Sequence, residues 1–173
     1  MSTTKKRKKW KEKAFALALL VLVIVSVGQA YVYYSKSFWA LDQARQYLYL
    51  ASTSPDMPKM IEYMARAGGY LQPYSGNPSF TLSPYNDFNT LRERLFSTIA
   101  TMQIWMSSAK PVQDFAYQTA VANIHGTITD ISNEITDTKV AMLYNPAWNP
   151  LGYLLLVIYI MYALLIIKYF MMS

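Results

Sequence analysis

Three acidic side chains at helical spacing are the clearest candidates for chemistry in this sequence. Asp130, Glu134 and Asp137 are related as i, i+4 and i+7, which brings their carboxylates to one side of a helix. Carboxylate oxygens bind Ca²⁺ or Mg²⁺, although such sites usually add carbonyl ligands from a loop. With Lys139 nearby, a solvated helix face is the favoured interpretation and a cation site is the alternative.

His125 is the only histidine, and the chain contains no cysteine. The lack of cysteine excludes disulfide scaffolds, thiol nucleophiles, iron–sulfur clusters and cysteine zinc sites. A single histidine with no acidic partner close in sequence lacks the other members of a catalytic triad or a zinc site. We therefore expect no catalytic residue, no metal site and no cofactor, and we do not expect an enzyme.

Methionine and tyrosine are frequent, with 10 and 15 residues respectively. Thioethers can bind Cu(I), but Met57, Met60 and Met64 follow the spacing of a helix core, which favours packing. Tyrosine is enriched in protein interfaces. The residues that we expect at a docking surface are aromatic or apolar and lie close to proline-marked turns: Tyr74, Phe80, Leu82, Tyr85 and Trp148.

The composition places these residues in an apolar but basic chain, with 53% hydrophobic residues, 15% charged residues and a formal net charge of +6. A basic tail, residues 1–13, precedes an uncharged segment, residues 14–34. As a helix this segment is about 31 Å long, which matches the hydrocarbon core of a bilayer. The tail abuts this span, so we expect a membrane partner and no nucleic acid. Its cations are Lys5, Lys6, Arg7, Lys8, Lys9, Lys11 and Lys13.

Residues 151–170 form a second apolar segment, interrupted only by Lys168, whose ammonium group can reach the lipid headgroups. Basic residues that flank a span stay in the cytoplasm. Two spans therefore predict a cell-membrane protein with both termini in the cytoplasm, residues 171–173 included. A cleaved signal peptide is the alternative for the first segment, because Gly28-Gln29-Ala30 resembles a cleavage site, but its length favours an uncleaved anchor.

Residues 35–145 are expected to form an extracytoplasmic helical domain. Apolar residues recur there at steps of three and four in four segments that prolines separate. The predicted fold is all-α, with two transmembrane helices flanking an up-and-down four-helix bundle, and residues 146–150 form a proline-rich joint before the second span. The most regular seam comprises Tyr117, Val121, Ile124, Ile128, Ile131, Ile135, Thr138 and Met142.

Local signals predict where two of these helices begin. We expect Ser54 to cap a helix that has Pro55 at its first position, and Asp87 to cap a helix that ends near Ser107. The expected apolar stripe of the earlier helix is Met57, Met60, Ile61, Met64, Ala65 and Leu71. The expected stripe of the later helix is Phe88, Leu91, Leu95, Ile99, Met102 and Met106.

The function that these features favour is a non-enzymatic accessory or scaffold subunit of a larger membrane complex. Few residues follow the second span, so we expect no output domain there. Tyr159 and Tyr162 within that span are less costly against protein than against lipid, which favours other membrane subunits or a second copy as partners. The alternative is an extracytoplasmic ligand-binding sensor that signals through a separate protein, since the plan resembles the sensor half of chemoreceptors.

Overall fold

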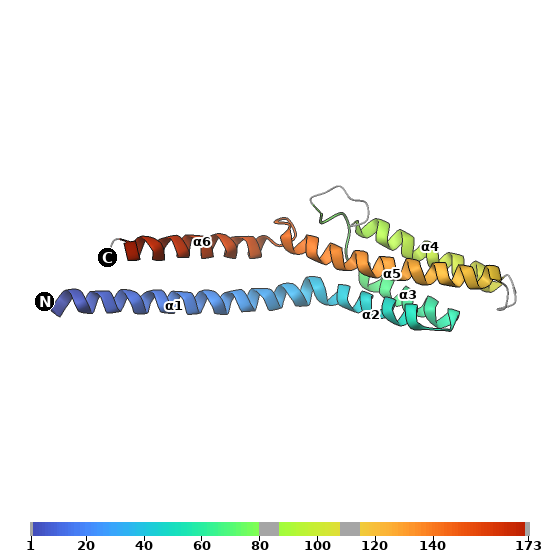
Figure 1. Cartoon of the computed structure of the whole chain (residues 1–173), viewed down its shortest axis with the longest axis horizontal. Coiled ribbons are helices and arrows are strands. Elements are labelled where there is room, and N and C mark those ends of the chain that lie inside the picture. The colour runs from blue at the N-terminus through green and yellow to red at the C-terminus, as the bar shows by residue number, and fades with distance from the viewer. Residues whose placement is uncertain (1, 80–86, 108–114, 172–173) are drawn as a thin grey trace. The chain divides into compact units, whose positions relative to one another are not determined.

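The protein is helical throughout the part of the chain that the structure describes. The computed structural model describes residues 2–79, 87–107 and 115–171, excluding the side chains of residues 2–9, 11, 12, 115–117 and 170. No strand occurs among these residues, so the predicted all-α class is confirmed. The helices are α1 (Ser2–Tyr33), the π-helix η1 (Tyr34–Phe38), α2 (Trp39–Thr53), α3 (Met57–Leu71), α4 (Phe88–Ser107), α5 (Phe115–Tyr144) and α6 (Pro150–Met171) (Figure 1).

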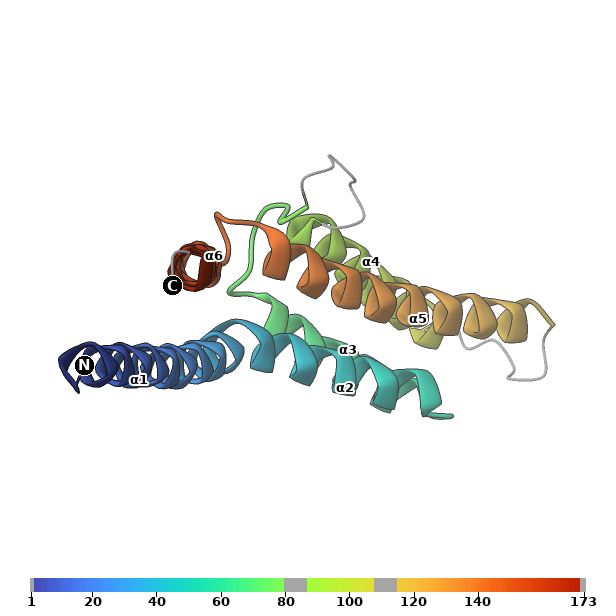
Figure 2. The ribbon, with the colours of Figure 1, turned by 60° about the vertical axis from the view of Figure 1, so that its left-hand side comes forward.

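The chain divides into two compact units. The first unit comprises Met1–Tyr34 and Pro150–Ser173, and within it α1 packs against α6. The second unit is Ser35–Asn149, in which α2 and α4 each contact both α3 and α5. Figure 2 shows α2 with α3 in one layer and α4 with α5 in the other. Among the described residues of the second unit, α2, α3, α4 and α5 thus form a ring of contacts around one apolar core.

The turn between α2 and α3 differs from the prediction. Ser54 is the C-terminal cap of α2 and donates its backbone N–H to Ala51 O at 3.2 Å, while Asp56 occupies the N-cap position of α3. A helix starting at Pro55 would place Pro58 where a backbone N–H is needed. Starting at Met57 instead places Pro58 within the first turn, where the missing N–H has no intrahelical partner to lose.

The buried stripe of α3 agrees with the prediction at four of its six positions, has Ile61 partly buried against the core, and differs at Ala65. Ala65 is exposed, whereas Ala67 and Gly68 are buried with the expected methionines and Leu71. Gly68 allows α4 to approach closely, because a Cβ atom at this position would lie 3.0 Å from Cζ of Phe96. The close crossing of α3 and α4 therefore selects which face of α3 is buried.

The start and the seam of α4 agree with the prediction except at its last turn. The Oδ1 atom of Asp87 accepts backbone hydrogen bonds from Asn89 at 2.7 Å and Thr90 at 3.3 Å, which is the expected cap. The prediction for Met106 is wrong, since its side chain is 47% exposed. Helix α4 has 20 residues against 15 in α3, so α3 does not cover it along its whole length. Its buried residues are Phe88, Leu91, Leu95, Ile99 and Met102.

The predicted seam of α5 is buried. Its members Ile124, Ile128, Ile131, Ile135, Thr138 and Met142 are at most 6% exposed. Val121 packs at the edge of the core, and the side chain of Tyr117 lies outside the description. The buried hydroxyl of Thr138 donates to Glu134 O at 2.7 Å, so this polar seam position keeps a hydrogen bond.

A short turn separates α5 from α6, as the two prolines predict. The carbonyl oxygen of Asn145 accepts backbone hydrogen bonds from Trp148 at 3.0 Å and Asn149 at 2.9 Å. Pro150 is the first residue of α6, a position that suits its fixed backbone angle. Helix α5 therefore does not continue into α6.

Substituting the isoleucine seam should unfold the second unit more easily. We expect Ile131→Ala to lower the free energy of unfolding by about 2–5 kcal/mol, because it opens a cavity at a site with 0% exposure. The control Ile104→Ala, at a site with 67% exposure, should change it by less than about 0.5 kcal/mol. Denaturant unfolding of the full chain in detergent, followed by circular dichroism, measures both. Equal destabilisation by the two variants would contradict the core described here.

Candidate functional site

Two of the residues predicted at a docking surface lie inside the second unit. Tyr74 is 8% exposed, its ring centroid lies 5.0 Å from that of Phe88, and its hydroxyl donates to Ser37 O at 2.6 Å. Trp148 is half-buried and its ring lies 5.9 Å from Phe88. These two side chains thus contribute to packing in this structure. Phe80, Leu82 and Tyr85 lie outside the described residues.

A different set of aromatic residues gathers along α2 and α3, where three tyrosines are partly buried against the core. We call Tyr47, Tyr63 and Tyr70 the aromatic face. Tyr47 stacks on Tyr70 with centroids 5.7 Å apart and an interplanar angle of 15°, and it lies 6.3 Å from Tyr63. Trp39 meets Tyr70 edge-on at 5.8 Å. The three tyrosine rings form a continuous series of contacts with Trp39 at its edge, and all these side chains remain at least partly exposed.

A charged pair borders the aromatic face. The guanidinium carbon of Arg66 lies 5.7 Å from the Tyr47 ring centroid, and its Nη2 donates to Glu62 Oε1 at 2.7 Å. Hydrogen bonding with Tyr47 and the charge of Glu62 raise the pKa of Arg66 above its ordinary value, so the group remains cationic. Tryptophan, tyrosine and arginine are the residues most enriched at the energetic centres of protein interfaces.

Sequence reasoning missed the aromatic face because its members come from two helices. Spacing alone places Tyr63, Arg66 and Tyr70 on one side of α3, at i, i+3 and i+7. It does not show that Tyr47 of α2 lies against Tyr70. That contact depends on the pairing of α2 with α3, which the structure supplies.

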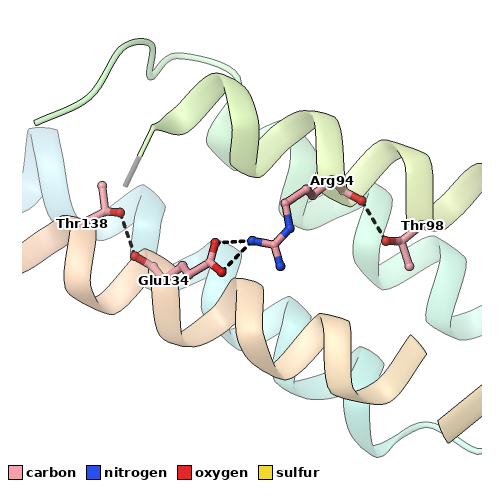
Figure 3. A network of polar contacts seen from close by, with 4 residues as sticks. All are labelled: Arg94, Thr98, Glu134 and Thr138. Carbon is pink, nitrogen blue, oxygen red and sulfur yellow. Dashed lines mark hydrogen bonds and ion pairs between the residues drawn. The ribbon is translucent and has the colours of Figure 1, made fainter. Parts of the chain in front are cut away.

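The acidic residues of α5 do not act together in this structure. Both carboxylate oxygens of Glu134 accept hydrogen bonds at 2.5 Å from Nη1 of Arg94 in α4 (Figure 3). Asp130 and Asp137 are exposed. Within residues 2–79, 87–107 and 115–171, no group of three or more potential metal ligands converges on one point. Glu134 therefore has a structural partner in place of the hypothesised cation.

Two further basic residues, Lys139 and Arg45, contact α2 or belong to it. Lys139 of α5 forms an ion pair with Asp42, and its Nζ atom lies 5.2 Å from the ring centroid of Phe38. This pair replaces the expected association of Lys139 with the acidic face of its own helix. The Nε atom of Arg45 is buried and has no hydrogen-bond partner among the described residues.

Helices α1 and α6 contain the two segments that are long and apolar enough to cross a membrane. These candidate spans are Lys13–Thr53, which continues through η1 and α2, and Pro150–Tyr169, and none of the most apolar window of either is buried. Burial inside this chain therefore does not account for their apolar composition. Exposed apolar segments of this length are typical of helices that lipid or another protein covers.

Two tyrosine hydroxyls of α6, those of Tyr159 and Tyr162, have partners within the first unit. The hydroxyl of Tyr159 lies 2.9 Å from Ser26 Oγ, and the hydroxyl of Tyr162 donates to the carbonyl oxygen of Phe15. Phe15 also contacts the Tyr162 ring edge-on at 6.0 Å. These tyrosines stabilise the pairing of α1 with α6, which differs from the expectation that another subunit would cover them.

The basic tail belongs to α1. Of its seven cations, only the side chain of Lys13 lies within the description, and it is exposed. The membrane-topology role of the other six cations stays a prediction from the sequence. They are Lys5, Lys6, Arg7, Lys8, Lys9 and Lys11.

Comparison of the chain with known protein families, curated proteins and solved structures finds no match.

The pair between α4 and α5 should contribute measurably to stability. The side chains of Arg94 and Glu134 are 32% and 16% exposed, so Glu134→Gln leaves a partly buried guanidinium without its counter-charge. We expect a loss of about 1–2 kcal/mol in the free energy of unfolding. The control Glu62→Gln removes the 55% exposed partner of Arg66 and should cost less than about 0.5 kcal/mol. Chemical denaturation that gives equal values for both would overturn this ranking.

Proposed function

We propose that this chain is a non-enzymatic accessory or scaffold subunit of a larger membrane protein complex. Its two apolar helices cross the cell membrane, and its second unit forms an up-and-down four-helix bundle on the extracytoplasmic side. The partner is another integral membrane subunit or a second copy of the chain. The observation that carries this proposal is the aromatic face of α2 and α3.

The arrangement of the aromatic face supports a docking role on energetic grounds. Tyr47 and Tyr70 are stacked before any partner binds, so ordering them on binding costs little conformational entropy. Partly exposed rings can bury large apolar areas while their hydroxyl groups form hydrogen bonds. Arg66 adds a permanent cation beside Tyr47, which favours a partner with acidic or aromatic groups.

Charge distribution supports the membrane orientation. Seven cations in the first thirteen residues precede the first span, which keeps the N-terminus in the cytoplasm. A second span then returns the chain to the cytoplasm, where Lys168 agrees with the same rule. The second unit lies outside in this topology.

The first unit supports the same proposal from inside the membrane. The hydroxyl groups of Tyr159 and Tyr162 form hydrogen bonds with Ser26 and Phe15 of α1. Pairing of α1 with α6 therefore already provides these polar groups with partners. Between residues 14 and 32 of α1 and between residues 151 and 167 of α6 the sequence has no charged residue, and most of the exposed side chains there are apolar. They suit packing against lipid or against the apolar helices of a neighbouring subunit.

A ligand-binding sensor is the second candidate, and one observation favours it. A buried guanidinium nitrogen without a partner is costly, and a bound anion would supply the acceptor that Nε of Arg45 lacks. An anionic ligand of the second unit should then raise its unfolding temperature in the native chain and not in Arg45→Met. A screen of small carboxylates and phosphates in which no compound separates the two proteins would remove this candidate.

Topology can be read with single cysteines, because the chain has none of its own. We expect a membrane-impermeant maleimide to label Thr129→Cys in intact cells, since Thr129 is exposed on α5. Ser2→Cys should react only after the membrane is permeabilised. The native chain serves as the unlabelled control. Labelling of the tail but not of α5 in intact cells would reverse the proposed orientation.

Removing two rings of the aromatic face should weaken association with the partner. We expect Tyr47→Ala combined with Tyr70→Ala to lower the amount of partner recovered per chain by about tenfold or more. The matched control is Tyr49→Ala, because Tyr49 belongs to the same helix and is 66% exposed but lies outside the aromatic face. Quantitative mass spectrometry of gently extracted complexes gives the ratio, and circular dichroism checks folding. Unchanged recovery with the folded double variant would exclude this surface as the docking site.

A further inference from the structure

The two chain connections of the second unit lie beside exposed apolar side chains. Trp39 is the first residue of α2, and Val140, Leu143 and Tyr144 belong to the last two turns of α5. Their exposed fractions are 48%, 51%, 42% and 62%. We call these four residues the apolar collar. Each is close in sequence to a helix that is apolar enough to cross a membrane.

We propose that the apolar collar lies in the headgroup layer of a phospholipid bilayer, so that lipid covers this end of the second unit. The inference rests on the membrane placement proposed above and adds a lipid-binding surface to it. The partner is defined chemically as the interfacial region of the bilayer. It is a mixed layer of glycerol, phosphate and the first methylene groups.

Chain length brings the collar within reach of that layer. The headgroup region adds about 5 to 8 Å on each side of the hydrocarbon core. Only η1, which has 5 residues, separates α1 from Trp39, and a helical segment of that length spans less than about 8 Å. Tyr144 is separated from α6 only by the hydrogen-bonded turn at Asn145. Neither connection is long enough to hold the collar far from the membrane.

The periodicity of α5 keeps its part of the collar turned outward. Ile135, Thr138 and Met142 are buried in the core of the second unit. Val140 and Tyr144 lie on the opposite side of the helix from this seam, at i and i+4. Because the buried seam fixes the rotation of α5, these side chains cannot turn into the core without unpacking it.

Residue types and charge fit a lipid interface. Tryptophan and tyrosine are enriched at the level of the headgroups, where their rings are partly apolar and partly polar. Lys36 is exposed and is the only charged residue between Tyr31 and Leu41, and no residue between Val140 and Pro150 is charged. The nearby carboxylate of Asp42 is paired with Lys139. The exposed acid nearest to the collar on its face of α5 is Asp137, one turn before Val140 and further from the connection to α6. Lys36 attracts lipid phosphates.

The test measures the depth of one tryptophan in a membrane. The full chain carrying only Trp39, with Trp10, Trp105 and Trp148 changed to Phe, is reconstituted into vesicles of phosphatidylcholine with a minor fraction of phosphatidylglycerol. Lipids brominated near the headgroup should quench its fluorescence by about twofold or more, and lipids brominated near the chain ends should quench it less. Unfolding curves establish that the substituted chain remains folded.

The matched control retains only Trp105. This residue belongs to α4, 17 positions after Phe88, which corresponds to about 25 Å along the helix. Since Phe88 lies beside Trp148 at the connected end, Trp105 belongs to the remote end of the second unit. Neither brominated lipid should quench it, while aqueous acrylamide should.

A second measurement examines α5 without changing the tryptophans. A nitroxide on Tyr144→Cys should collide more often with oxygen, which concentrates in lipid, than with a water-soluble nickel complex. The same label on Ile104→Cys, a site 67% exposed on α4, should show the reverse ranking. The chain has no native cysteine, so each label is unique.

The possible results separate the two proposals. A protein that fails to float with the vesicles contradicts the membrane placement itself. If the protein floats, but Trp39 and the nitroxide at position 144 respond to aqueous reagents alone, the proposal for the apolar collar is wrong. The membrane placement then remains intact. Protection from both lipid and water, increasing with the ratio of protein to lipid, also overturns it and identifies a second copy as the occupant.

Discussion

Burial of the isoleucine seam of α5 is the interaction on which the second unit depends. Helix α5 is the longest helix of this unit, with 30 residues, and it contacts both α2 and α4. Ile128, Ile131 and Ile135 are each 0% exposed, and fully burying a side chain of this size contributes about 1.5–3 kcal/mol. Two ion pairs between described residues of different helices also involve α5, through Glu134 to Arg94 and through Lys139 to Asp42. A fixed rotation of α5 therefore sets the geometry of the whole ring.

The patterns within single helices could be predicted from sequence, and contacts between helices could not. Steps of three and four identified the buried seam of α5, and Asp87 identified the start of α4. The prediction for Ser54 is wrong because two prolines compete for the first turn of α3 and Pro58 decides its position. The sequence predicts Tyr74 at a docking surface. In the structure its hydroxyl donates a hydrogen bond to the carbonyl oxygen of Ser37, 37 residues away in sequence, a contact that sequence spacing does not reveal.

The aromatic face illustrates the same limit at the candidate site. When each helix is considered alone, its tyrosines show no contact with those of the other helix. Pairing of α2 with α3 brings them together as a stacked series beside the cation Arg66. A binding partner then meets one contiguous aromatic surface. The surface left exposed at one end, the apolar collar, depends in turn on the rotation that the α5 seam imposes. Packing in the core thus determines both the aromatic face and the apolar collar.

The most direct test of the central claim is the mass of the native particle. The chain, of 19.8 kDa, would be extracted from its own membranes with a mild detergent, separated by size and examined by native mass spectrometry. We expect a stoichiometric assembly that contains this chain together with a larger integral membrane protein, or a defined assembly of its own copies held through the aromatic face. A particle that contains only a single copy of this chain would contradict it.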